Sequence, residues 1–261
     1  MVHNKIPTTI ILILATLLIS CQVDSYSKFN KINLYPNNTS IILPIYHDLA
    51  INWDSLLTDL SKCSKPILVL EEQQIKPFNA EKLKRSLQTA RKLKFHIAIK
   101  IPTRYGTRPM EEIAQQLIRI QDILPEINSI FIDEVHDSPD MFDYYYQLSG
   151  IARELGYNFI IMNTSNSLNL EQFLQISDAL VIYENMGISE DIIPNKSLRD
   201  KSIVIIYTSS WQDLTPFIKY LRKGLIAKWI FITDIYSESA TKVLALPSFW
   251  NKLIEQICVK G

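Results

Sequence analysis

The stretch Ile130-Phe131-Ile132-Asp133-Glu134 carries two adjacent carboxylates directly after a short apolar run. A short run rich in β-branched and aromatic residues is typical of a buried β-strand. Burial of an ionised carboxylate is costly unless it is paired or hydrogen-bonded, and two adjacent carboxylates also repel each other. In a (β/α)8 barrel the carboxyl ends of the strands build the active site. We therefore interpret Asp133 and Glu134 as candidate catalytic groups, with a solvated strand end as the alternative.

The rest of the chain repeats this alternation of apolar runs and helical patterns. Near-continuous apolar strands, each followed by a helix or by room for one, predict a parallel sheet that is covered on its outside. We expect an α/β fold with a single (β/α)8 TIM barrel over residues 39–261. A doubly wound open sheet is the alternative, but its Gly-rich nucleotide fingerprint is missing. The other seven expected strands cover residues 41–45, 67–70, 96–101, 159–162, 179–183, 203–206 and 229–232.

The N-terminus has the features of a targeting segment. Lys5 precedes a mostly apolar run over residues 8–20, which is shorter than the roughly 20 residues of a membrane-spanning helix. The run ends in Leu18-Ile19-Ser20-Cys21, which resembles a bacterial lipobox. We expect residues 1–20 to be a signal peptide, Cys21 to be acylated, and residues 21–38 to be a lipidated polar tether. The protein would then be exported and membrane-anchored through Cys21 on the cell envelope. An ordinary secretory signal is the alternative.

Composition excludes several classes of function. Lys and Arg together number 27, as do Asp and Glu, so the formal net charge is zero and a nucleic-acid partner is disfavoured. No Gly-rich phosphate loop, paired CxxC or HExxH motif occurs, and the four histidines lack ligand spacing. We expect no cofactor, no metal and a monomeric protein.

Two cysteines remain in the mature chain, Cys63 and Cys258. Export permits a disulfide, and both residues fall near the ends of the first and last barrel helices, which become neighbours on closure. The sequence leaves a disulfide and two buried free thiols both open, and we slightly favour the free thiols.

Polar residues gather at the carboxyl ends of the expected strands. Aromatic rings stack on the apolar faces of sugars, while amides and carboxylates bind hydroxyl groups, so this set predicts a sugar site at the barrel mouth. Its members are Tyr46-His47, Glu71-Glu72, Thr103-Arg104-Tyr105, Asp133-Glu134, Asn163, Glu184-Asn185, Tyr207 and Asp234.

Glycoside hydrolysis needs two carboxylates that flank the scissile bond. Asp133 or Glu134 would be the general acid, and Glu184 the nucleophile or base. If the strand ran regularly through both members of the acidic pair, they would point to opposite faces. One of the two would then be a supporting residue, unless the strand ends between them.

Four motifs carry a resemblance to a known family. The chain resembles the spherulation-specific family 4 (spherulin-4-like) proteins from about Leu43 to Trp250. The resemblance implies a (β/α)8 glycoside hydrolase that is endo-acting on α-1,4-linked galactosaminoglycan, with Asp133, Glu134 and Glu184 as catalytic acids and the polysaccharide as partner. The motifs are Thr103-Arg104-Tyr105-Gly106-Thr107-Arg108-Pro109, Ile130-Phe131-Ile132-Asp133-Glu134, Tyr183-Glu184-Asn185 and Leu246-Pro247-Ser248-Phe249-Trp250. We expect the substrate to be bound by Tyr46, His47, Tyr105, Arg108, Asn163, Asn185 and Asp234.

The chain departs from the family pattern at the expected barrel mouth. It has Leu70-Glu71-Glu72 where the family has Asn-Pro, Asn163-Thr164-Ser165 in place of Asn-Pro-Gly, and Thr233-Asp234-Ile235 in place of Thr-Asp-Asp. These departures motivate an alternative function: a non-catalytic carbohydrate-binding lipoprotein on the same barrel.

Overall fold

The computed structural model describes residues 39–45, 52–72, 75, 80–136, 138–164, 169–187, 196–208, 210–212, 214, 218, 227–237, 240–243 and 245–258. The expected signal peptide, Cys21 and the tether lie outside these residues, as do the expected substrate-binding residues Tyr46 and His47. Within the described ranges, no helix is both long and apolar enough to cross a membrane.

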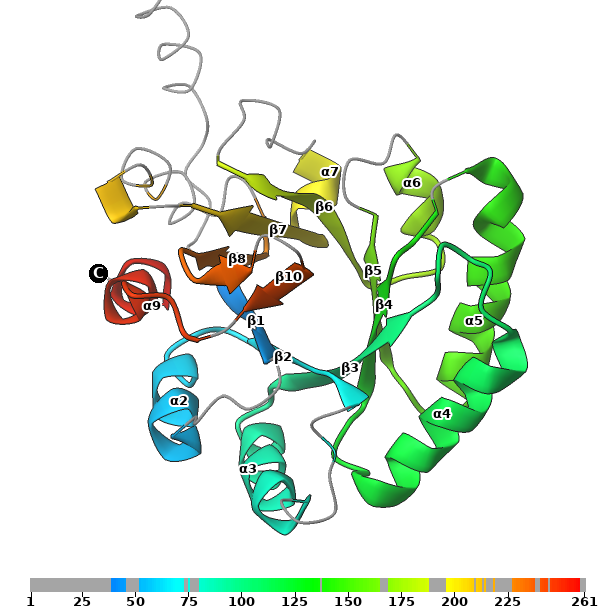
Figure 1. The fold of residues 1–261 in the computed structure, drawn as a ribbon, viewed down its shortest axis with the longest axis horizontal. Helices are drawn as coiled ribbons and strands as arrows, with labels where there is room; N and C mark the ends of the chain where they lie inside the picture. The colour runs from blue at the N-terminus through cyan, green and yellow to red at the C-terminus, as the bar shows by residue number, and fades with distance from the viewer. Residues whose placement is uncertain are drawn as a thin grey trace, which may run out of the picture. The chain divides into compact units, whose positions relative to one another are not determined.

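Eight parallel strands close into a barrel in chain order (Figure 1). The ring is completed by β1, which pairs with β2 on one side and β8 on the other. This closed topology confirms the predicted (β/α)8 barrel and excludes the open sheet. The strands are β1 (Ser40–Ile45), β2 (Ile67–Leu70), β3 (His96–Pro102), β4 (Ser129–Asp133), β5 (Phe159–Asn163), β6 (Ala179–Met186), β7 (Ser202–Tyr207) and β8 (Trp229–Thr233).

Helices cover the outside of the strands, and α2 to α5 surround one side of the ring in Figure 1. A short antiparallel pair, β9 (Tyr236–Ser237) and β10 (Ala240–Val243), follows the barrel strands. The helix expected after β7 falls mostly outside the described residues, although Leu214 and Ile218 of its apolar face are buried. The helices are α2 (Trp53–Leu60), α3 (Ala80–Lys92), α4 (Met110–Ile123), the 3-10 turn η3 (Pro139–Met141), α5 (Phe142–Glu154), α6 (Leu170–Phe173), α7 (Lys196–Arg199) and α9 (Trp250–Cys258).

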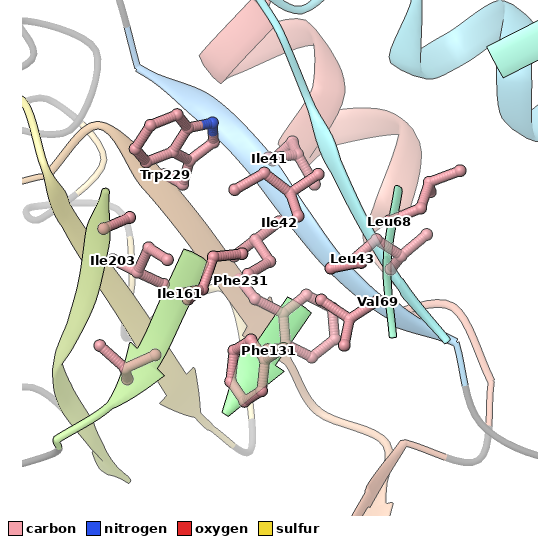
Figure 2. Packing of buried hydrophobic residues seen from close by; sticks show 14 of the residues in the cluster. Ile41, Ile42, Leu43, Leu68, Val69, Phe131, Ile161, Ile203, Trp229 and Phe231 are labelled. Carbon is pink, nitrogen blue, oxygen red and sulfur yellow. The ribbon is translucent and has the colours of Figure 1, made fainter. Parts of the chain in front are cut away.

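Apolar side chains from different strands fill the barrel interior. Figure 2 shows Val69, Phe131, Ile161 and Phe231 pointing toward one another between the strands, and all four belong to one buried cluster. Burial of each such side chain contributes about 1.5–3 kcal/mol. The barrel interior is therefore a packed apolar core.

A disulfide joins Cys63 to Cys258. Our preference for two free thiols is therefore wrong. Cys63 follows α2 and Cys258 is the last residue of α9, and closure of the barrel brings these helices together. Trp250 on α9 is buried and donates its indole N–H to Asp59 Oδ2 at 3.1 Å, a second link between the two helices. The disulfide therefore links the first and the last described helix of the barrel, α2 and α9.

A bulge in β6 changes which side chains of this strand face the barrel interior. In the register with β7, Val181 pairs with Ile203, but Tyr183 pairs with Val204 and Glu184 with Ile205. One additional residue, Ile182, thus stands on β6. Because side chains alternate along a strand, the extra residue brings Glu184 to the same face as Val181.

Candidate active site

Five polar side chains from five consecutive strands form a connected group at the carboxyl end of the barrel, which we call the mouth cluster. Lys100 Nζ lies 2.7 Å from Asp133 Oδ2. The Asn163 amide donates to both acids, to Asp133 Oδ1 at 2.9 Å and to Glu184 Oε2 at 2.7 Å. The Tyr207 hydroxyl donates to Glu184 Oε1 at 2.7 Å. The structure thus brings two of the three predicted catalytic acids together through one side-chain amide.

Strand register explains why these residues meet. Lys100 pairs with Phe131, and Phe131 pairs with Ile161. Paired residues of parallel strands share a face, and side chains two residues apart do so as well. Asp133 and Asn163, each two residues beyond a core residue, therefore stand directly above the packed interior.

Lys100 lies between two acids. Its ammonium group is 2.7 Å from Asp133 Oδ2 and 3.9 Å from Glu71 Oε1, and both Lys100 and Glu71 are only 16% exposed at the side chain. Burial of a cation is costly unless it is paired, so the two carboxylates account for its position. Glu71 therefore belongs to the floor of the site, as its strand-end position predicts.

Glu134 has a different role from Asp133 in the structure. Strand β4 ends at Asp133, and Glu134 turns into the left-handed region with φ of 55°. The strand therefore ends between the two acids, which was one of the two predicted alternatives. The Glu134 carboxylate accepts the backbone N–H of Arg104 at 2.9 Å, and its carbonyl accepts the N–H of Tyr105 at 3.0 Å. Glu134 thus holds the loop after β3 and makes none of the contacts of the mouth cluster.

The loop after β3 is tightly constrained. Arg104, Tyr105 and Gly106 have φ of 51°, 55° and 81°, and left-handed conformations are unfavourable for the first two. The Thr103 hydroxyl reaches the carbonyls of both Asp133 and Glu134, at 2.9 and 2.8 Å. Because these bonds fix the turn, Tyr105 is held close to the carboxyl end of β3, and 59% of its surface is exposed.

Two tyrosines of α5 support the loops after β3 and β4. Tyr144 donates its hydroxyl to Arg108 O at 2.7 Å, and burial raises its pKa to about 12. The Tyr145 hydroxyl accepts the N–H of His136 at 2.7 Å, and burial likewise raises its pKa. Both hydroxyl groups therefore stay protonated around neutral pH and serve as hydrogen-bonding supports.

The remaining predicted substrate-binding residues are dispersed. The Arg108 guanidinium is 14% exposed and bonds Pro102 O at 3.3 Å, so it braces the loop after β3. Asn185 is exposed, and its own side chain accepts the N–H of Met186. Asp234 accepts the N–H and the hydroxyl of Ser248. These three residues bond other partners than the mouth cluster, whereas Asn163 stands at its centre.

The sequence reasoning missed two members of the mouth cluster as site residues. Lys100 interrupts an otherwise apolar strand, and strand alternation from the end of β3 would have placed it inward. Tyr207 was noted at the end of its strand, but it was not selected for the site. Among the residues that the structure describes, no group of His, Cys, Asp and Glu has the arrangement of a metal site.

Comparison with known proteins identifies the family. The model of the spherulation-specific family 4 matches residues 40–257. A search of curated proteins finds no match. Three solved structures are similar to the chain. A beta-glycosidase has a TM-score of 0.46 and 10% identity, and the match covers 88% of this chain and 99% of that chain. A thiamine phosphate pyrophosphorylase from Pyrococcus furiosus has a TM-score of 0.44 and 12% identity, with 85% of this chain and 98% of that chain covered, and a phospho-2-dehydro-3-deoxyheptonate aldolase from Thermotoga maritima has a TM-score of 0.43 and 13% identity, with 87% of this chain and 70% of that chain covered. At these scores the likenesses say nothing about activity.

Proposed function

Because the chain belongs to the spherulation-specific family 4, we propose that it is a glycoside hydrolase that cleaves an amino-sugar polysaccharide of the α-1,4-galactosaminoglycan type. The observation that carries this proposal is the pair of carboxylates, Asp133 and Glu184, that share the Asn163 amide. Both side chains are partly accessible at the barrel mouth, where a polymer can reach them. Glycoside hydrolysis requires such a pair.

The hydrogen-bond partners of the two acids favour different roles. Both Asp133 oxygens face groups that can only donate, the Lys100 ammonium and the Asn163 amide N–H. This environment suits a residue that acts as a carboxylate, so Asp133 is the nucleophile. Glu184 bonds the Tyr207 hydroxyl, which can donate to a carboxylate or accept from a carboxylic acid. Glu184 can therefore carry a proton and return to the charged form without losing this partner, which suits the acid and base. These proposed roles are the reverse of those expected from the sequence, in which Asp133 or Glu134 is the acid and Glu184 the nucleophile or base.

The separation of the two acids favours a retaining reaction. Asp133 Oδ1 and Glu184 Oε2 lie 2.9 and 2.7 Å from the same nitrogen, so these two oxygens are at most about 5.6 Å apart. A bound of this size fits the roughly 5–5.5 Å between the carboxyl groups of retaining enzymes better than the roughly 6.5–9.5 Å of inverting ones. In the first step Asp133 bonds the anomeric carbon while Glu184 protonates the leaving oxygen. In the second step Glu184 takes a proton from water, the water oxygen bonds the anomeric carbon, and the bond from that carbon to Asp133 breaks.

The test is release of new reducing ends from a polysaccharide panel that includes fully and partly N-acetylated galactosaminoglycan. We expect Asp133→Asn and Glu184→Gln each to lower kcat roughly 100- to 10,000-fold. Unchanged turnover by either variant would overturn the role assigned to that residue. Proton NMR of the first product should show the anomeric configuration of the substrate, and inversion would refute the retaining pathway.

The alternative is a carbohydrate-binding protein that lacks catalysis. It is favoured by the departures from the family pattern at the barrel mouth, among them Glu71 beside Lys100. Binding to the polymer without any new reducing ends, in the wild-type protein, would select this alternative.

We also propose that the protein is exported and held on the cell envelope by acylation of Cys21. This proposal is supported by the apolar run that ends in Leu18-Ile19-Ser20-Cys21. One acyl chain gives only marginal membrane affinity, so stable attachment requires more than one chain on the cysteine. Cells fed a clickable fatty acid should label the wild type but not Cys21→Ser. A mature N-terminus at any residue other than Cys21 would refute the anchor.

A further inference from the structure

A cavity of about 450 Å³ lies beyond the carboxyl ends of β7 and β8, because Ser210 and Asp234, which follow these strands, line it. Its lining combines the Trp211 and Phe249 rings with the polar side chains of Gln212, Asn251 and Lys252. The volume falls within the range of about 300–1,000 Å³ that is common for small-ligand pockets. No member of the mouth cluster lines this cavity, so it is a separate feature of the same face.

The walls of the cavity are held by contacts with the barrel. Asp234, which follows β8, accepts the N–H of Ser248 at 2.9 Å and also accepts the Ser248 hydroxyl. The Trp211 and Phe249 rings are 5.3 Å apart between centroids, so the indole is held against a buried partner. A half-buried aromatic ring in a fixed orientation is a ready stacking surface.

The lining indicates the charge of the ligand. The Asp234 carboxylate already occupies the approach to the α9 N-terminus, where a phosphate or another anion would bind. Lys252 is exposed on the same wall and repels a cation such as an unmodified amino sugar. The partly exposed Trp211 ring, two primary amides and no unpaired acid suit a neutral sugar, whose hydroxyl or acetamido groups the amides of Gln212 and Asn251 can bind.

The position of the cavity connects it to the mouth cluster. Tyr207, which bonds Glu184, pairs in register with Thr233, and Asp234 follows directly. The N–H of Thr208 bonds Thr233 O at 2.9 Å, so the two strand ends stay joined at this point. A polymer with its scissile bond over Glu184 that continues toward β8 would therefore reach the cavity.

We propose that this cavity is a second carbohydrate subsite, in which Trp211 stacks on a neutral or N-acetylated sugar unit of the chain that the mouth cluster cleaves. The identity of the polymer rests on the proposed function. The subsite itself requires only that the sugar chain binds, whether or not it is cleaved. It binds N-acetylated units more tightly than de-N-acetylated units.

The experiment measures binding in the Asp133→Asn background, where the polymer stays intact. The probes are fully N-acetylated and fully de-N-acetylated galactosaminoglycan oligomers. Isothermal titration calorimetry measures their affinity for each variant. We expect Trp211→Ala to weaken affinity for the N-acetylated oligomer roughly tenfold. Trp211→Phe keeps a ring and should lose less. Gln212→Ala is an exposed change that leaves the packing intact, and it should weaken the same oligomer severalfold.

The matched control is Tyr146→Ala on α5, an aromatic residue that is 62% exposed and lies outside the cavity lining. It should leave both affinities unchanged. Equal affinities of the Asp133→Asn protein with and without Trp211→Ala would overturn the subsite. So would a loss of affinity in Tyr146→Ala as large as in Trp211→Ala, or no binding of the oligomers by the Asp133→Asn protein. Cleavage by the wild type with no effect of Trp211 on binding would refute the subsite alone. Binding that depends on Trp211, without any cleavage, would refute the hydrolase alone.

Discussion

Substitution of Glu134 separates a positioning role from a catalytic one. The carboxylate accepts the Arg104 N–H at 2.9 Å, and Arg104 and Tyr105 both have left-handed φ angles. Glu134→Ala removes this acceptor, whereas Glu134→Gln keeps a neutral oxygen in its place. If Glu134 only holds the loop, the amide should rescue most of the function that alanine loses.

The structure sets the expected size of each effect. A hydrogen bond to a charged acceptor contributes about 1.5–3 kcal/mol and a neutral one about 0.5–1.5 kcal/mol. The left-handed conformations of Arg104 and Tyr105 cost about 1–2 kcal/mol per residue, so the loop is strained and loosens when one of the bonds that hold it is removed. A net change of about 2 kcal/mol corresponds to roughly a 30-fold loss in kcat/KM for Glu134→Ala. Glu134→Gln should lose about fivefold or less.

The assay is reducing-end release over a range of polymer concentrations, with Asp133→Asn for comparison. Glu111→Ala is a suitable control, because Glu111 lies on the neighbouring α4 and its carboxylate accepts from Gln115. Glu134→Ala should act mainly on KM, since the Tyr105 ring is displaced while the mouth cluster stays intact. A loss of kcat in Glu134→Gln as large as that of Asp133→Asn would refute this reasoning and make Glu134 a proton-transfer group.

Three further predictions concern stability. Burial, with help from Lys65 and Arg91, lowers the pKa of His96 to about 4. Between pH 6.5 and 4 the unfolded chain therefore binds a proton that the folded chain does not. As the pH is lowered from 6.5 to 4, the free energy of unfolding should decrease by on the order of 2 kcal/mol, after allowance for the partial exposure of the side chain. Urea unfolding at both ends of this window should show a smaller fall for His96→Gln, and an equal fall would contradict the assignment. Reduction of the Cys63–Cys258 bridge, which spans 195 residues, should cost about 2–5 kcal/mol, and the Cys63→Ser/Cys258→Ser double variant should melt alike with and without reductant. Gly106→Ala should destabilise by about 1–3 kcal/mol in a thermal melt, because its φ is 81° and a Cβ would lie 2.9 Å from Met141 Sδ. Wild-type stability in this variant would contradict the tight turn.

The predicted site and the observed cluster overlap in part. Asp133, Asn163 and Glu184 were chosen from their positions at strand ends, and the barrel brings them together. Asn185 stands in the same strand-end set and Arg108 belongs to the Thr103–Pro109 motif, but each bonds the backbone of its own strand or of the strand before it instead. Position at the end of a strand predicts that a residue lies near the barrel mouth. The backbone that follows the strand decides where its side chain points.

The sequence by itself determined the barrel, because repeated apolar strands and helical patterns are local features that each segment carries alone. It also determined which acids stand at the carboxyl ends of β4 and β6. Only the tertiary structure decided that Ile182 forms a bulge, which brings Glu184 to the face that meets Asn163. The Cys63–Cys258 bridge likewise depended on closure of the barrel. The physical reason is that register and closure arise from contacts between residues far apart in the chain, which the pattern of one segment does not contain.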